Sequence, residues 1–288
     1  MKKRILIIIV LLLCLTTTGC FKRDNMEDIN IITSAYPIEY VTNELYGKSS
    51  IVNSIYPDGT NIFEYKLNNK QLDDYSKQDL FIYLGLSNDK DIAVDLLNRN
   101  NDILIIDASF GMELKYGVEE LWLNPSNLLM ISQNIKNGLQ EYINSSYLNK
   151  EIDKSYSELK VKLSELDADI KLTAEISNNK TIIVSNDVFR FLEKYGFEII
   201  SLDPDTVTDK AINDAQDQIN SGSNKYIFTL ENEEENQYIK TIQQNTTVEL
   251  LTLKNIANIT DEERNNNENY IKLMNENLEL IKKETYKD

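Results

Sequence analysis

Short apolar segments alternate with amphipathic segments along most of the chain. The apolar segments end at polar or glycine-containing turns, and this pattern predicts strands separated by helices. The predicted strands cover residues 28–34, 51–56, 79–85, 102–108, 180–185, 197–202, 225–230 and 248–253. Most of these strands lack a polar face, which is typical of a parallel sheet that helices cover on both sides.

The middle of the chain follows a different pattern. Neither glycine nor proline occurs between Gly138 and Gly196. Within that segment, apolar residues spaced three or four positions apart form one stripe: Ile152, Tyr156, Leu159, Leu163, Leu166 and Ile170. The stripe predicts a single long helix. A coiled coil is the alternative, but the stripe is short for one and the strand–helix alternation resumes after it.

These patterns predict an α/β protein with two lobes, each with a roughly four-stranded parallel sheet flanked by helices. We expect an N-terminal lobe over residues 28–146, one long rigid linking helix over 147–178, and a C-terminal lobe over 179–288. The last predicted helix covers 261–283. Open parallel sheets bind ligands beyond the carboxyl ends of their strands, so a ligand cleft is expected between the lobes.

The first 27 residues precede this alternation. A basic start, Met1–Arg4, is followed by an apolar run over Ile5–Leu15 and by Thr16-Thr17-Thr18-Gly19-Cys20. This layout predicts a lipoprotein signal peptide over 1–19, a lipid on Cys20 and a short tether over 20–27. The apolar run is shorter than the roughly 20 residues of a membrane-spanning helix. Thr17 departs from the leucine usual at its position, and an ordinary signal peptide is the alternative.

Composition narrows the chemistry of the secreted part. The chain has no histidine, and its two cysteines are Cys14 in the signal peptide and Cys20. Disulfides, thiolate or histidine metal ligands and Ser-His-Asp triads are therefore excluded. Loss of Lys2, Lys3 and Arg4 changes the net charge from −17 to −20. Such acidity argues against nucleic-acid binding, and no phosphate-binding glycine motif occurs.

Several segments, taken in order, resemble one family. They are Ile31-Ile32-Thr33-Ser34-Ala35-Tyr36-Pro37, Tyr56-Pro57-Asp58-Gly59, Asp79-Leu80-Phe81-Ile82-Tyr83, Leu121-Trp122-Leu123-Asn124-Pro125 and Ile183-Val184-Ser185-Asn186-Asp187. Together they are similar to segments of the TroA/ZnuA-like substrate-binding lipoproteins of zinc and manganese ABC importers. The resemblance implies a non-enzymatic protein whose partners are an ABC permease and its ATPase. It also implies attachment to the extracytoplasmic face of a bacterial membrane, and we expect a monomer.

The metal-ligand positions of the family are altered here. The first two fall near Asn61 and on Glu120, the third falls on Asn186, and the fourth falls near Lys254, or on Thr252 in another register. Asn61, Glu120 and Asn186 offer only oxygen ligands, which suit manganese better than zinc. The cargo is thus a divalent metal, an organic ligand, or no ligand at all.

Lys254 is the least expected residue at these positions, because an ammonium repels a metal cation. We hypothesise that it replaces the metal and pairs with Glu120, Asn61 and Asn186, since a buried ammonium requires such partners. The alternative is that Lys254 points to solvent. A second functional hypothesis is a surface interaction or adhesion lipoprotein that kept the scaffold and lost metal binding.

Overall fold

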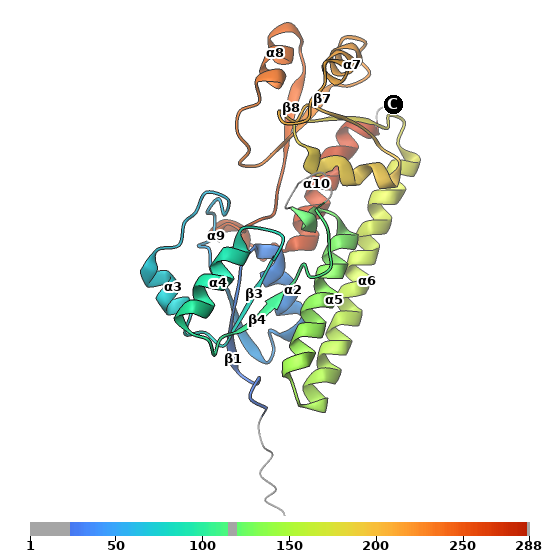
Figure 1. Cartoon of the computed structure of the whole chain (residues 1–288). Coiled ribbons are helices and arrows are strands. Elements are labelled where there is room, and N and C mark those ends of the chain that lie inside the picture. Colours follow the sequence, from blue (N-terminus) through green and yellow to red (C-terminus); the bar gives the residue numbers. More distant parts are fainter. Residues whose placement is uncertain (1–23, 115–119, 287–288) are drawn as a thin grey trace, which may run out of the picture.

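Two parallel sheets form the centres of two lobes (Figure 1). The computed structural model describes residues 24–114 and 120–286. The N-terminal sheet has the order β2-β1-β3-β4, and the C-terminal sheet has the order β6-β5-β7-β8. The strands are β1 (Ile29–Thr33), β2 (Ser50–Ser54), β3 (Leu80–Tyr83), β4 (Leu104–Asp107), β5 (Thr181–Val184), β6 (Glu198–Ser201), β7 (Tyr226–Leu230) and β8 (Glu249–Leu253). The predicted fold class is confirmed.

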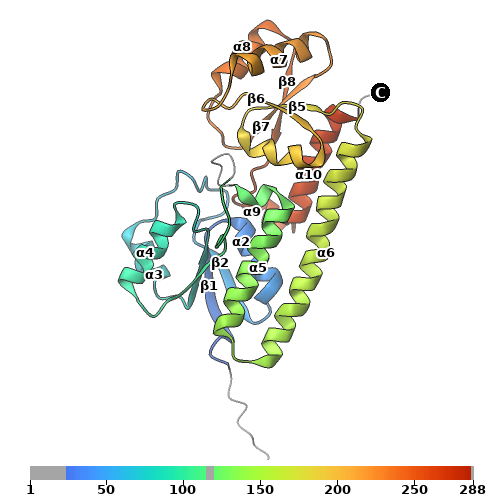
Figure 2. The same cartoon turned by 45° about the vertical axis from the view of Figure 1, so that its right-hand side comes forward.

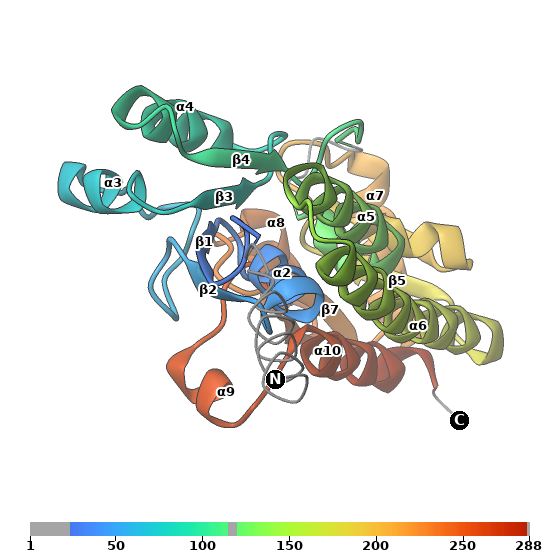
Figure 3. The same ribbon diagram turned by 90° about the horizontal axis from the view of Figure 1, so that it is seen from below.

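Alternate residues of the N-terminal strands bury opposite faces of the sheet. Ile31 and Ile82 belong to one apolar core, whereas Ile32 and Phe81 belong to another on the opposite face. Helix α2 (Tyr36–Tyr46) packs on the first face, and α3 (Asn69–Tyr75) and α4 (Asp89–Arg99) pack on the second. Figure 3 shows this separation of the helices on either side of the sheet.

A helical pair joins the lobes along one side of the molecule (Figure 2). The short 3-10 helix η1 (Leu121–Leu123) is followed by α5 (Pro125–Tyr142), which packs against α6 (Ser146–Ile176). Helix α6 has 31 residues and therefore extends for about 46 Å at 1.5 Å per residue. The predicted stripe is its buried face, with Tyr156 half-buried and the other five residues buried.

The C-terminal lobe departs from the prediction in two places. The segment after β5 is a 3-10 helix, η2 (Asp187–Tyr195), and α7 (Asp209–Asn220) and α8 (Gln237–Asn245) follow later in the lobe. The last predicted helix is divided into α9 (Asp261–Asn265) and α10 (Tyr270–Thr285). It is interrupted where Asn267 adopts a φ of 55°, and Asn269 then caps the start of α10.

The end of α10 is tied to the amino ends of the C-terminal strands. Glu284 is fully buried, and its carboxylate accepts hydrogen bonds from the backbone N–H groups of Lys225 and Tyr226 at 2.9 and 2.8 Å. The carbonyl of Thr285 accepts hydrogen bonds from the backbone of Asn178 and Asn179. The last helix in the sequence is thus bound to the C-terminal sheet.

No helix in the described part of the chain combines the length and apolarity needed to cross a bilayer. The predicted signal peptide and Cys20 lie outside the described residues.

Candidate functional site

A cavity of about 820 Å³ lies between the two lobes. Both sheets contribute to it through the loops that follow their strands, as expected for open parallel sheets. One lining residue follows each of six strands: Ala35, Tyr56, Leu84, Ser185, Asp203 and Glu233. Its size falls within the range of roughly 300–1,000 Å³ that is typical of small-molecule sites.

The first turns of α4 give the N-terminal wall its negative charge. Asp89, Asp91 and Asp95 all line the cavity. Asp89 is only 7% exposed, and its Oδ1 accepts a hydrogen bond from the Tyr56 hydroxyl at 3.3 Å. Burial raises the pKa of the Asp89 carboxyl, and the hydrogen bond from Tyr56 partly opposes that shift.

Asp187 and Asp203 form the first acidic pair of the C-terminal wall, and both accept hydrogen bonds from residues of the same lobe. Asp187 accepts hydrogen bonds from Arg190 Nε and from the Thr206 hydroxyl, both at 2.7 Å. Burial acts to raise the pKa of Asp187, but these hydrogen bonds outweigh it, so the pKa lies below its usual value. Asp203 accepts hydrogen bonds from the backbone N–H groups of Asp187 and Asp205. These two carboxylates therefore organise the loops of the wall.

Glu233 forms the second acidic position of the C-terminal wall. Its Oε2 accepts a hydrogen bond from the Ser185 hydroxyl at 2.6 Å. Burial raises the pKa of the Glu233 carboxyl, against the opposing effect of that hydrogen bond. The neighbouring Glu234 also lines the cavity and is exposed. Together with Asp205 and Glu120, the acids named here face a cavity in which Lys66 is the single basic lining residue among those that the structure describes.

The acidic residues do not converge on one point. Among residues 24–114 and 120–286, no three acidic, histidine or cysteine side chains are grouped closely enough to hold a metal ion. Apolar and aromatic side chains also line the cavity, among them Tyr65, Phe63 and Ile92. The rings of Tyr56 and Tyr65 meet edge to face at 5.9 Å. The cavity therefore offers dispersed negative charge together with apolar surface.

Two of the four predicted ligand positions line this cavity. Glu120 immediately precedes η1, and Asn186 caps the start of η2 by accepting a hydrogen bond from Val188 N at 2.9 Å. Trp122, which follows Glu120, is 1% exposed and donates from Nε1 to the carbonyl of Asn255 at 2.7 Å. Trp122 is thus a core residue where the lobes meet.

The other two predicted positions line a smaller cavity of about 190 Å³, which shares Ile62 with the large one. Asn61 accepts a hydrogen bond from Phe63 N at 3.2 Å. Lys254 Nζ donates to Glu263 and lies 3.7 Å from Glu276. The structure therefore places the Lys254 ammonium against these two glutamates, and not in the hypothesised group with Glu120 and Asn186.

Thr252, the alternative fourth position, is exposed on β8 and lines neither cavity. Its hydroxyl lies 3.0 Å from that of Thr229 on the neighbouring strand. Of the two registers considered for the fourth ligand position, the one with Lys254 places that residue in the lining of a cavity, namely the smaller one.

Residues 254–265 form an interlobe strap, which carries the chain from the end of β8 to the N-terminal lobe (Figure 1). The carbonyls of Ala257 and Ile259 accept hydrogen bonds from Tyr36 N and Gly59 N at 2.9 and 2.8 Å. The side chain of Asn258 donates to the carbonyls of Pro57 and Thr60. The strap thereby binds the loop after β2 along its backbone.

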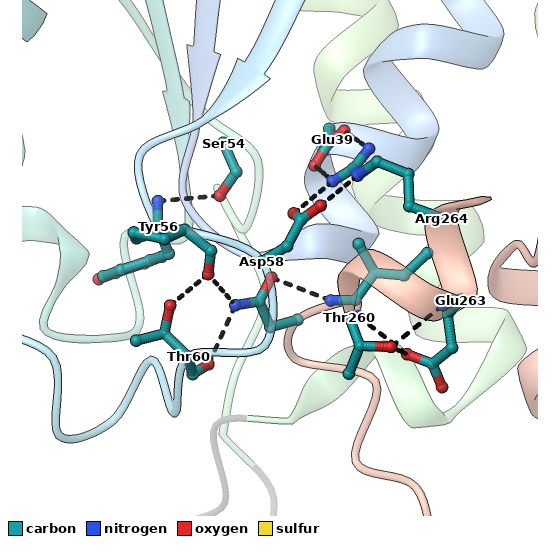
Figure 4. A network of polar contacts seen from close by, with 11 residues as sticks. Glu39, Ser54, Tyr56, Asp58, Thr60, Thr260, Glu263 and Arg264 are labelled. Carbon is teal, nitrogen blue, oxygen red and sulfur yellow. Dashed lines mark hydrogen bonds and ion pairs between the residues drawn. The ribbon is translucent and has the colours of Figure 1, made fainter.

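Arg264 completes the attachment of the strap (Figure 4). Its guanidinium contacts both oxygens of Asp58, at 2.6 and 2.8 Å, and both oxygens of Glu39, at 2.7 and 3.2 Å. The Glu39 side chain is 6% exposed. Sequence reasoning did not identify this group, because its partners lie more than 200 positions apart. The capping box formed by Thr260 and Glu263 was the local signal that a helix begins there.

Comparisons with known proteins agree with this architecture. A family profile described as ZnuA, zinc-uptake complex component A periplasmic, matches residues 31–284. The zinc-binding lipoprotein AdcA of Streptococcus pneumoniae (strain ATCC BAA-255 / R6) is 22% identical over 312 residues, which cover 98% of this chain and 61% of AdcA. The metal ABC transporter substrate-binding lipoprotein of Lactococcus lactis subsp. lactis is 26% identical over 216 residues, or 67% of this chain and 68% of the relative.

The solved structures add a match in fold. The Zn(II)-bound ZnuA-like domain of Streptococcus pneumoniae AdcA matches with a TM-score of 0.73 and 21% identity, covering 90% of this chain and all of that domain. This chain spans about three fifths of the length of full AdcA. Because the family profile extends over nearly all of the described residues, the chain belongs to the ZnuA family.

Proposed function

We propose that this chain is the non-enzymatic substrate-binding component of an ABC importer, anchored through a lipid on Cys20 to the extracytoplasmic face of the membrane. The cavity between the lobes carries the proposal, since it lies at the carboxyl ends of both sheets and is large enough for a cargo. The name of the Lactococcus lactis relative supports the transporter class. The partners are then a membrane permease and its ATPase.

In this proposal the cargo is a cation that the protein binds without histidine ligands. Acidic side chains of both lobes line the cavity, and the chain has no histidine. Glu120 and Asn186 are the candidate cargo contacts at the family's ligand positions, whereas Asn61 and Lys254 belong to the smaller cavity. If the cation is a metal, these oxygen ligands favour manganese over zinc.

Isolation of the protein from its host membrane tests the transporter assignment. After mild chemical crosslinking in cells, we expect an affinity isolate to contain an integral permease and an ATPase. We expect Cys20→Ala to leave the protein in the soluble fraction and to reduce that recovery. An isolate that instead contains only surface or extracellular proteins would support the adhesion alternative.

Metal titration tests the cation at the same site. Dialysed protein is titrated by calorimetry with manganese, zinc, calcium and magnesium, beside Glu120→Gln and the control Glu249→Gln. Glu249 is exposed at the start of β8, far from the carboxyl ends of the strands. Binding that is lost only in Glu120→Gln would place a metal in the large cavity, and elemental analysis of chelator-free protein would identify it.

A further inference from the structure

We propose that the interlobe cavity takes an organic cation with at least two ammonium groups on an apolar chain, such as a diamine or polyamine. This inference rests on the proposed function, because it treats that cavity as the cargo site. It goes further by naming a chemical class of cargo for which the walls of the cavity are suited.

Within the described residues, the buried carboxylate of Asp89 has hydrogen-bond donors but no basic partner. This carboxylate lines the cavity and is more than nine-tenths buried. Its hydrogen bonds come from neutral donors, among them the hydroxyls of Tyr56 and Ser87 and the backbone at Leu84. In the described part of the chain, no lysine or arginine contributes to its electrostatic surroundings. A buried carboxylate is costly without a cationic partner. A cation that enters the cavity would supply one.

The opposite wall repeats the arrangement. Glu233 is half-buried, accepts a hydrogen bond from the neutral hydroxyl of Ser185 and, within residues 24–114 and 120–286, has no basic side chain at ion-pair distance. Asp89 belongs to the N-terminal lobe and Glu233 to the C-terminal lobe. A ligand with two separated positive charges can therefore contact one carboxylate on each lobe.

The mixed apolar and acidic lining of the cavity favours an organic ligand over a bare metal ion. A metal requires several oxygen ligands around one point, and no such acidic group occurs among the described residues. The cavity instead includes Tyr56, Tyr65, Phe63 and Ile92. Aromatic rings attract ammonium groups through their faces, and apolar side chains accommodate methylene groups. A chain of methylenes with an ammonium at each end uses both kinds of surface.

Calorimetry of the purified full-length protein tests this inference at fixed ionic strength. The probes are spermidine, putrescine, 1,8-diaminooctane and, as the single-charge control, octylamine, beside manganese and zinc chlorides. We expect spermidine or a diamine to bind at least tenfold more tightly than octylamine. We expect Asp89→Asn and Glu233→Gln each to weaken that binding at least tenfold.

Matched variants separate a defined contact from general attraction to an acidic protein. Asp102→Asn and Glu249→Gln remove the same charges from exposed positions at the amino ends of the two sheets, and we expect them to change binding less than twofold. Equal weakening by all four variants would overturn the inference. Amine affinity that does not exceed that of octylamine would overturn it too.

The metal probes distinguish this inference from the function on which it rests. Manganese or zinc binding that Glu120→Gln abolishes, with no binding of any amine, would overturn the organic cation and leave the importer proposal standing. Binding of neither amines nor metals would overturn both proposals for this cavity. Because Asn and Gln closely match the shapes of Asp and Glu, and two walls are tested separately, one misfolded variant does not decide the outcome.

Discussion

The carboxylates around the interlobe strap and those on the walls of the interlobe cavity have different kinds of partner. Around the strap, Glu39 and Asp58 contact Arg264, and Glu263 accepts a hydrogen bond from Lys254. On the cavity walls, Asp89 and Glu233 have neutral hydroxyl and backbone donors and no basic partner among the residues that the structure describes. The acids around the strap therefore stabilise the fold. The acids on the cavity walls can instead bind a cationic ligand.

Among the substitutions that test this comparison, Arg264→Met is expected to cause the largest loss of stability. Loss of one partner from a fully buried ion pair costs about 3–5 kcal/mol. Because Arg264 is 43% exposed, solvent screening reduces this, and we expect a loss of about 2 kcal/mol in the free energy of unfolding. Urea denaturation measures it. We also expect faster amide exchange at Gly59, whose N–H donates to the strap.

Two further variants control that result. Lys272→Met removes an exposed charge that lies 3.9 Å from Glu268, and we expect it to change stability by less than about 0.5 kcal/mol. Adding Glu39→Gln to Arg264→Met removes the buried charge that Arg264 leaves behind, so the double variant is expected to be more stable than Arg264→Met alone. A double variant that loses more stability would mean that Arg264 does not act by compensating Glu39.

The pH dependence of stability sharpens the comparison, because the two regions should respond in opposite directions. Burial raises the pKa of Asp89, so the folded protein binds its proton more tightly than the unfolded chain does. The contribution of Asp89 to stability is therefore greatest at low pH, and it falls as pH rises from about 4, the unfolded value, through the folded pKa. In Asp89→Asn this fall should disappear, leaving the variant as stable as the wild type, or up to about 1 kcal/mol more stable, at pH 7.

Glu263 of the strap should show the reverse behaviour. Burial acts to raise its pKa, but hydrogen bonds from Lys254 and Thr260 outweigh burial and lower it. Its contribution to stability is present above the unfolded pKa of about 4.3 and is lost as pH falls through the lower folded pKa. Glu263→Gln should therefore lose stability at pH 7 and converge with the wild type in acid. Urea midpoints between pH 3 and 8 check both variants, and parallel curves for the two would contradict the comparison.

The smallest effect is expected for Lys254→Met. Lys254 is one-third exposed, and Glu263 keeps its hydrogen bonds from Thr260 when the ammonium is removed. We expect a loss of at most about 1 kcal/mol in the free energy of unfolding. Because Lys254 lines the smaller cavity, binding in the large cavity should be unchanged. A marked gain or loss of ligand affinity would instead indicate that the two cavities act as one binding site.

The fold was largely predictable because buried parallel strands and an amphipathic helix leave strong local patterns. Helix α5 was not predicted, although its buried residues Leu128, Ile131, Ile135 and Leu139 form a stripe of this kind, and Gly138 lies inside it. The structure explains that glycine, because a Cβ at position 138 would lie 2.8 Å from side-chain atoms of Ile106 on β4. Glycine is needed at position 138 because of a residue on a neighbouring strand, and the sequence around α5 does not reveal that contact.

The candidate site was predictable only in part, for a similar reason. Positions after strands can be located from the sequence, and Glu120 and Asn186 do line the cavity. The partner of a long side chain depends on the tertiary structure, so neither the contact of Lys254 with Glu263 nor that of Arg264 with Glu39 could be predicted. The importance of Asp89 likewise arises from burial, which its place in an acidic helix start did not indicate.

The buried carboxylate of Glu284 has a consequence for the order in which the chain is assembled. The backbone N–H groups at the start of β7 donate to a side chain almost sixty positions later. The C-terminal lobe therefore lacks part of its framework until the end of α10 has been synthesised and has docked. A chain that ends before residue 284 would leave these N–H groups without their acceptor, so a short C-terminal truncation should loosen a lobe whose strands lie far from it in the sequence.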